Sequence, residues 1–156
     1  MKGNAKLIEA LNSLLADELT AINEYMVHAE MCDNWGYERL HKLAEKRARD
    51  EMKHAEKLIA RILFLEGLPI VSTLREIRIG SEVPKQLAND LSLEMGAVRS
   101  YNEAVELARE VKDNTTEELL ESILNDEDDH VNKLEEQQDQ IAQMGLQIYL
   151  GQQVKE

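Results

Sequence analysis

Apolar residues recur along this chain at spacings of three and four, which places them on one face of an α-helix. Four long segments carry this pattern. Each spans roughly 28 residues, or about 42 Å as a helix. A shorter apolar pattern follows in residues 146–156, where we expect a short fifth helix. The four segments are Asn4 to about Asn34, about Glu38 to Glu66, about Pro84 to Lys112, and Thr115 to Gly145.

Residues that disfavour helix separate the four segments. Trp35-Gly36 ends the first. Gly67-Leu68-Pro69 ends the second, because proline cannot continue a helix and glycine can adopt the left-handed conformation that caps one. Pro84 suits the first turn of the third helix. Thr115 to Glu118 has the spacing of a capping box, in which the threonine hydroxyl would accept a backbone N–H of the fourth helix.

Residues 68–81 lack the helical pattern and are long for a connection between neighbouring helices. A connection of this length is typical of bundles in which the simple up-and-down order is broken by a crossover. The pattern therefore predicts an all-α four-helix bundle with one long crossover connection and a short fifth helix, forming one domain over residues 1–156.

Composition narrows the classes of protein. Only 7 of the 156 residues are glycine and 2 are proline, which disfavours a β-sandwich or barrel. The net charge of −13 disfavours sequence-independent binding of nucleic acid, since contacts to phosphates require basic residues. It suits a protein that collects cations. No apolar run long enough to span a membrane and no signal-peptide core is present, and Cys32 is the single cysteine. We therefore expect a cytoplasmic protein.

Ionisable residues interrupt the apolar face of every long segment. Glu18 lies on the apolar face of the first segment and Glu94 on that of the third. The second and fourth segments each carry Glu-x-x-His, which puts both side chains on one helical face. The six inward groups are Glu18, Glu51, His54, Glu94, Glu127 and His130.

Burying four carboxylates demands that their charge be cancelled. Two divalent cations would do so, and two neutral imidazoles would complete their coordination; carboxylates with one nitrogen per ion favour iron or manganese. Glu18 or Glu94 taken singly is more typical of a side chain that extends to water at the edge of the apolar face. The six residues at matching heights on four helices favour the metal site. A non-catalytic helical interaction protein, with the six groups bonded to one another, is the alternative from a different functional class.

Several strings in this chain resemble those of the bacterioferritins, the haem-binding branch of the ferritin family. They are Met1-Lys2-Gly3, Asp50-Glu51-Met52-Lys53-His54-Ala55, Ile62 to Pro69, and Met144-Gly145-Leu146-Gln147. The resemblance covers the whole chain. It implies a ferritin-like bundle whose six inward residues ligate a di-iron ferroxidase centre, with Glu51 and Glu127 bridging the ions. It also implies a hollow shell of twenty-four subunits, built from two-fold dimers, that stores iron as a ferric mineral.

The same resemblance implies further roles. Met52 would ligate haem b together with the same residue of a two-fold related subunit, although by itself it is equally consistent with a methionine in a subunit contact. Tyr25 resembles a tyrosine beside the di-iron site, with core packing as its alternative. Leu68 and Pro69 resemble part of a docking surface for a small ferredoxin that would assist iron release through the haem.

Other positions depart from the family or suggest no chemistry. Asp50 resembles an iron ligand on the inner surface of some members, but Lys46 stands where they have a second ligand. We expect Cys32 to be a small buried apolar residue, His28 to lie at the surface, and Asp126 to be a solvated charge, as are Asp128 and Asp129. The alternative among enzymes is another carboxylate-bridged di-iron or dimanganese oxidase or peroxidase.

Overall fold

A computed structural model describes residues 1–155 and contains the five helices that the hydrophobic pattern predicts. All five predicted helices are confirmed. The ends of the four long helices differ from the predicted ones by at most two residues, whereas the fifth helix is shorter than predicted; residue 156, where its prediction ends, lies outside the described residues. Their bounds are α1 Ala5–Asn34, α2 Glu38–Phe64, α3 Val83–Glu110, α4 Asn114–Met144 and α5 Leu146–Gly151.

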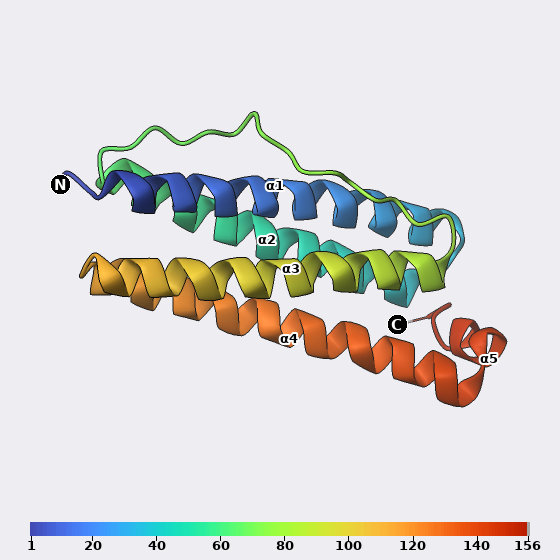
Figure 1. Ribbon diagram of the computed structural model, residues 1–156. Coiled ribbons are helices and arrows are strands. Elements are labelled where there is room, and N and C mark those ends of the chain that lie inside the picture. Colours follow the sequence, from blue (N-terminus) through green and yellow to red (C-terminus); the bar gives the residue numbers. More distant parts are fainter. Residues whose placement is uncertain (156) are drawn as a thin grey trace.

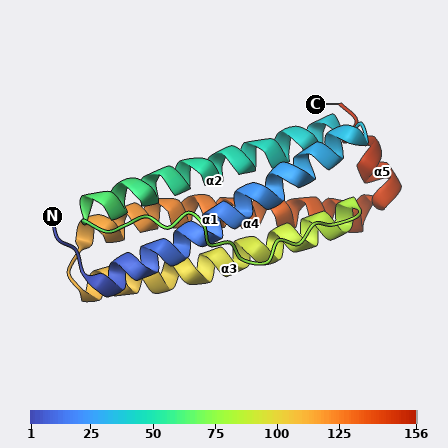
Figure 2. The same cartoon turned by 90° about the horizontal axis from the view of Figure 1, so that it is seen from above.

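The four long helices form a bundle in which α1 packs mainly on α2, and α3 on α4 (Figures 1 and 2). The short turn after α1 makes α2 antiparallel to it. The connection after α2, residues 65–82, then runs the full length of the bundle, so that α3 starts at the end where α2 started. The predicted crossover is therefore confirmed. Within residues 1–155, no helix has the length and apolar character that crossing a bilayer requires.

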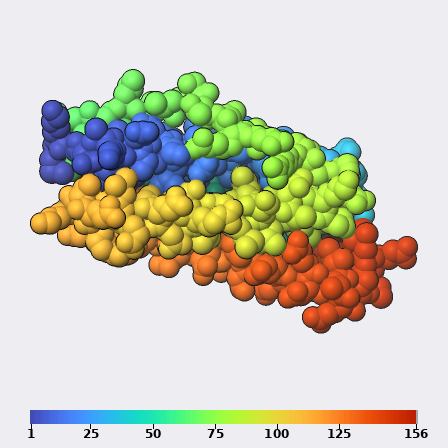
Figure 3. All heavy atoms as spheres, viewed as in Figure 1, coloured from blue at the N-terminus to red at the C-terminus, as the bar shows by residue number. Residues whose placement is uncertain are grey.

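The crossover is held against α1 by polar side chains of that helix. Asn12 Oδ1 accepts the backbone N–H of Ile70 at 2.8 Å, and Thr20 Oγ1 accepts that of Arg75 at 2.8 Å. The Arg75 guanidinium also donates to Asp17 at 2.9 Å. These bonds replace the backbone pairing that an extended segment lacks. Figure 3 shows the crossover atoms, in green, lying on α1 and reaching α3.

The end of α2 differs from the prediction. Glu66, with φ 62°, adopts the left-handed conformation that was expected of Gly67. Gly67 is required for a different reason, because a Cβ there would lie 2.7 Å from Ile8 Cγ2. The glycine therefore allows α1 and the end of α2 to approach closely.

The predicted capping box at Thr115 is wrong. Helix α4 begins one residue earlier, and Asp113 is its N-cap. The Asp113 carboxylate accepts the backbone N–H of Thr116 at 3.0 Å, and it also accepts from the Arg61 guanidinium at 3.0 Å. Both interactions lower the pKa of Asp113, although its partial burial opposes this. An aspartate N-cap that also pairs with an arginine stabilises the first turn of α4 more than the predicted threonine N-cap would.

This correction has a measurable consequence. We expect Asp113→Ala to lower the free energy of unfolding by about 1–2 kcal/mol, the usual cost of losing an N-cap. The matched control Thr115→Ala, at an exposed position of the same turn, is expected to change it by less than about 0.5 kcal/mol. Chemical denaturation of both variants measures the difference. Equal losses in the two variants would restore the capping box as the better description.

The apolar core consists of two clusters with a polar layer between them. One cluster, around Leu7, Leu58 and Ile123, fills the end of the bundle near the N-terminus. The other, around Leu40, Leu87 and Tyr149, fills the opposite end and includes α5. The six inward ionisable residues occupy the middle, so packing at both ends holds the four helices in register across this layer.

Candidate metal centre

The structure brings together all six inward residues predicted from the hydrophobic pattern. Helix α1 supplies Glu18 and α3 supplies Glu94, while α2 and α4 each supply a Glu-x-x-His pair. None is more than 5% exposed. We call Glu18, Glu51, His54, Glu94, Glu127 and His130 the six-residue cluster.

The cluster divides into two groups that share two carboxylates. Glu18 and His54 form one group with Glu51 and Glu127, and Glu94 and His130 form the other with the same two glutamates. In each group, the potential ligand atoms lie within 4.8 Å of one another. Two adjacent groups of three carboxylates and one imidazole are arranged as two metal ions with two bridging carboxylates require.

The two histidines face the shared carboxylates through the same ring nitrogen. His54 Nδ1 lies 3.0 Å from Glu127 Oε1 and 3.4 Å from Glu51 Oε1. His130 Nδ1 lies 3.2 Å from Glu51 Oε1 and 3.6 Å from Glu127 Oε1. Each Nδ1 therefore points to the centre from its own side.

Most of the cluster's inward atoms have no hydrogen-bond partner among residues 1–155. Buried polar atoms are normally paired, so a concentration of unpaired ones needs a physical explanation. Metal ions between them would coordinate all of these atoms, and the donor set of oxygens with one nitrogen per ion fits iron or manganese. The unpaired atoms are Glu18 Oε2, Glu51 Oε1, His54 Nδ1, Glu94 Oε2, Glu127 Oε1 and Glu127 Oε2.

Aspartates outside the cluster orient both histidines. His54 Nε2 lies 2.9 Å from Asp126 Oδ2, and His130 Nε2 lies 3.1 Å from Asp50 Oδ2. A carboxylate at Nε2 accepts the ring proton there and leaves Nδ1 free to bind a metal ion. Asp126 is exposed, as expected, but it also has this contact, which the sequence did not reveal. Asp50 is also paired with Lys46 at 3.1 Å, so the lysine occupies the carboxylate that resembles an inner-surface iron ligand.

Two buried tyrosines donate to the terminal carboxylates of the cluster. The Tyr25 hydroxyl donates to Glu94, and the Tyr101 hydroxyl donates to Glu18 at 2.6 Å. Burial and the nearby carboxylates raise the pKa of both phenols, so they stay protonated donors. The Arg47 guanidinium lies 5.3 Å from the centre of the Tyr25 ring. Sequence reasoning singled out Tyr25 and missed Tyr101. The available signal was the position of Tyr101 on the apolar face of α3, seven residues or about two helical turns after Glu94.

The charges of the cluster shift the pKa values of its members in the protein without metal ions. Burial alone would lower the histidine values, but the Glu127 and Glu18 carboxylates raise the pKa of His54 to about 11. In the same way, Glu94 and Glu127 raise that of His130 to about 9. Burial and repulsion between carboxylates raise the pKa of Glu51 and bring that of Glu94 to about 7. Protons therefore compensate the carboxylates until metal ions replace them.

Metal binding is accordingly expected to release protons. At pH 7 both histidines are protonated, since their pKa values are about 11 and about 9. Each must lose a proton to become a ligand, so at least two protons per chain leave when two ions bind. The overall affinity for the two ions then rises by at least about 100-fold per pH unit below pH 9, and more steeply where the Glu51 and Glu94 carboxyl groups also carry protons. Zn²⁺ titration in a pH-stat measures this, and binding without proton release would contradict it.

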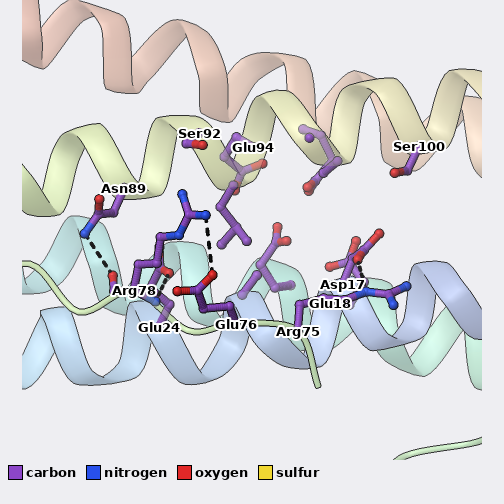
Figure 4. Close-up of a pocket in the computed structure, with 16 residues that line it drawn as sticks. Asp17, Glu18, Glu24, Arg75, Glu76, Arg78, Asn89, Ser92, Glu94 and Ser100 are labelled. Atoms are coloured by element: carbon purple, nitrogen blue, oxygen red, sulfur yellow. Dashed lines mark hydrogen bonds and ion pairs between the residues drawn. The ribbon is translucent and has the colours of Figure 1, made fainter. Parts of the chain in front are cut away.

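A pocket connects the cluster to the surface beneath the crossover. It has a volume of about 270 Å³. Glu18, Glu51, Glu94 and Glu127 contribute to its lining. Figure 4 shows side chains of α1 and α3 facing into it, with Arg75, Glu76 and Arg78 of the crossover at its rim. We call it the crossover pocket; it gives small ions a route to the carboxylates.

The remaining sequence-predicted residues lie away from the cluster. Met52 is 48% exposed and Leu68 is 79% exposed. Cys32 is buried, and burial raises the pKa of its thiol to about 11, as suits an inert core residue. The expectation that His28 lies at the surface is wrong, since it is 1% exposed. The crossover covers His28. Because the crossover has no hydrophobic periodicity, its position against α1 could not be predicted from the sequence.

Comparison with known proteins gives a consistent result. Residues 8–144 match the model of the ferritin-like domain of the Ferritin family. The chain is 39% identical to a bacterioferritin of Mycolicibacterium paratuberculosis over 152 residues, which cover 97% of this chain and 96% of the relative. It is 41% identical to one of Brucella melitensis over 96% of this chain and 92% of the relative. With one of Rhodobacter capsulatus it shares 44% identity over 88% and 85% of the two chains.

Proposed function

Because the chain belongs to the bacterioferritins of the ferritin family, we propose that it stores iron, oxidising Fe²⁺ at the six-residue cluster and depositing ferric mineral inside a shell of many subunits. The observation that carries this proposal is the pair of buried carboxylate–histidine groups that share Glu51 and Glu127. The relatives are similar over nearly their whole length, which favours iron storage over another di-iron or dimanganese oxidase.

Two Fe²⁺ ions are the substrate of the proposed reaction. Together they transfer two electrons to O₂ or H₂O₂, and two protons are taken up to give H₂O₂ or water. Glu18 and His54 would hold one ion and Glu94 and His130 the other, while Glu51 and Glu127 would contact both. Paired ions avoid a one-electron reduction of oxygen, which would give a free radical.

The surrounding residues position these ligands. Asp126 and Asp50 fix the histidine rings with Nδ1 inward. The hydroxyls of Tyr25 and Tyr101 hold Glu94 and Glu18, so that one oxygen of each remains for the ion. We assign Tyr25 to the catalytic site because its ring is buried against the cluster and its hydroxyl donates a hydrogen bond to Glu94, a proposed ligand. The six cluster residues are at most 5% exposed, so water screens these interactions little and each of them is strengthened.

We also propose that Met52 binds haem b between two subunits. Its side chain is half exposed on α2 and is therefore available to a neighbouring molecule, as an axial ligand shared across a two-fold axis must be. The haem would carry electrons to the stored mineral for iron release. A small ferredoxin is the proposed electron donor, with the exposed Leu68 and neighbouring Pro69 in its docking surface.

The proposed assembly is a homo-oligomeric cage of twenty-four subunits in the cytoplasm. Its acidic chains, with a net charge of −13 each, would concentrate Fe²⁺ at the shell. A cage is the form that lets an oxidised and insoluble product stay in solution.

Iron loading of the purified protein tests the proposal. Fe²⁺ is added aerobically in excess over two ions per chain, and the particle is then analysed by size-exclusion chromatography and electron microscopy. A shell with an electron-dense iron core is the expected result. A small particle that leaves the iron to precipitate would overturn storage and favour the alternative enzyme.

A further inference from the structure

A second group of buried ionisable side chains lies beside the six-residue cluster. Glu24 and His28 come from α1, and Asp90 comes from α3, one helical turn before Glu94. All three are at most 2% exposed. One potential ligand atom of each lies within 4.8 Å of those of the other two. None of the roles described above uses them.

The hydrogen bonds of His28 decide which of these atoms are available. The backbone N–H of Gly80 donates to His28 Nε2 at 2.9 Å. Nε2 is therefore the acceptor nitrogen, and the ring proton lies on Nδ1, from which it is donated to Asp90 Oδ1 at 2.9 Å. His28 is thus fully bonded. It orients Asp90 and does not itself offer a lone pair.

Glu24 has one oxygen in use and one without a partner. Its Oε1 accepts the backbone N–H of Arg78 at 3.1 Å, which ties the crossover to α1. Its Oε2 is buried and has no hydrogen-bond partner among residues 1–155. Asp90 lies next to the Glu24 carboxyl group, and an ionised carboxylate in this position needs a proton or a cation beside it.

The neighbouring arginines supply that charge only in part. Arg75 pairs with Asp17 at 2.9 Å, and the Arg78 guanidinium lies 3.5 Å from Glu76. Burial and the adjacent Asp90 raise the pKa of Glu24 to about 8, although the backbone N–H and the charge of Arg78 oppose the shift. A bound proton and a divalent cation therefore compete for the space between the two carboxylates.

Glu24 also lines the crossover pocket, together with four carboxylates of the six-residue cluster (Figure 4). An ion that enters the pocket from the surface can thus reach Glu24 without passing through the protein interior. We propose that Glu24, on the wall of this pocket, and the adjacent Asp90, which is not part of the lining, bind a third divalent cation, one per chain, with His28 as the residue that positions Asp90.

The ligand chemistry indicates the class of ion. Both ligands are carboxylates and no nitrogen or sulfur is free, so water must complete the coordination of a hard divalent ion such as Mn²⁺ or Fe²⁺. Two protein ligands hold such an ion more weakly than the six-residue cluster does, which suits an ion in transit. The identification of the ion as Fe²⁺ on its way to oxidation rests on the proposed function; the binding of a cation does not.

Glu24→Gln is the variant that tests the site. The amide oxygen still accepts the Arg78 N–H and the amide N–H can donate to Asp90, so the crossover stays anchored while the charge is lost. Asp90→Asn is the second variant, because its amide oxygen still accepts the His28 proton. The matched control is Glu76→Gln, which removes one charge at the rim of the same pocket from a side chain that is 77% exposed.

Mn²⁺ is the probe. Binding is followed by the electron paramagnetic resonance signal of free Mn²⁺, and positions are found from anomalous scattering of crystals soaked in Mn²⁺. We expect three ions per chain in the wild type and in Glu76→Gln, with one peak between Glu24 and Asp90. We expect two ions in Glu24→Gln and in Asp90→Asn, with that peak missing from both.

A wild-type crystal with ions only at the six-residue cluster would overturn the third site and leave the proposed function intact. A proton shared by Glu24 and Asp90 would then neutralise these two carboxylates. Retention of the third ion in Glu24→Gln would overturn the third site as well. The opposite result would be an ion at Glu24 and Asp90 with none at the six-residue cluster. It would support the third site and overturn the proposed function.

Discussion

Replacing Glu127 by glutamine is expected to abolish rapid iron oxidation while leaving the metal-free protein nearly as stable as before. Glu127 is fully buried, and neither of its carboxylate oxygens has a hydrogen-bond partner among residues 1–155. Glu127 belongs to both groups of potential ligands. Even an outer partner of a metal ligand is worth about 10–100-fold in affinity, so the loss of a shared ligand is expected to slow Fe²⁺ oxidation by about 100-fold or more.

The stability of the metal-free protein is expected to change little, because the Glu127 carboxylate attracts the protonated histidines of the cluster and repels its other carboxylates. A neutral amide removes both effects, and its N–H can donate to the unpaired Glu51 Oε1. We expect a change of less than about 1 kcal/mol in the free energy of unfolding, or less than about 4 °C in Tm.

Stopped-flow absorbance measures the oxidation, and calorimetry of the protein after chelation of metals measures Tm. The matched control is Glu135→Gln, the same change at an exposed position of α4, which is expected to leave both quantities unchanged. Unchanged oxidation in Glu127→Gln would remove this residue from the ligand set. A loss of activity accompanied by a large fall in Tm would instead indicate a purely structural role.

Replacing Met52 by leucine is expected to remove the haem and to leave iron oxidation intact. Leucine has nearly the volume of methionine but no sulfur, so the axial ligand is lost from both subunits of a pair by one substitution. Because Met52 is half exposed on α2, the change is not expected to disturb the core. The haem content, half a haem per chain in the proposed wild type, falls to about a tenth of that or less.

The absorbance of the reduced protein, with its Soret band and split α and β bands, measures the haem. Met95→Leu on α3 is the matched control, since its side chain is 45% exposed and it has no proposed ligand role. Wild-type protein purified without haem, even after haem is supplied during expression, would refute the role of Met52. Iron release from loaded shells is expected to be slower in Met52→Leu, with oxidation at the wild-type rate.

The residues of the six-residue cluster could be found from the sequence because each interrupts a regular apolar pattern. A helix fixes the direction of every side chain relative to its own axis, so Glu18 or a Glu-x-x-His pair can be placed on the inward face without knowledge of the neighbours. The requirement that buried charge be cancelled then pointed to metal ions. The structure brings these six side chains together; their role as ligands is what Glu127→Gln tests.

Other features depended on contacts between elements. Tyr101 has the same spacing as an ordinary core residue, and only the axial alignment of α1 with α3 shows that it donates to Glu18. Asp126 has the composition of a solvated surface residue, and only the packing of α2 against α4 brings it to His54. These contacts depend on the rotation and axial shift of one helix relative to another, which periodicity does not specify.

The crossover could be predicted from the sequence as a long connection, but its position on the bundle is known only from the folded structure. The hydrophobic pattern by itself determined an all-α bundle, one long crossover and an inward layer of glutamate and histidine, because helical spacing is a local property of the chain. It did not determine where residues 65–82 lie, since an extended segment has no periodicity of its own. In the folded chain, the backbone N–H of Arg78 donates to Glu24 and that of Gly80 donates to His28. These contacts bury the Glu24 and His28 side chains and create the proposed second place for a cation.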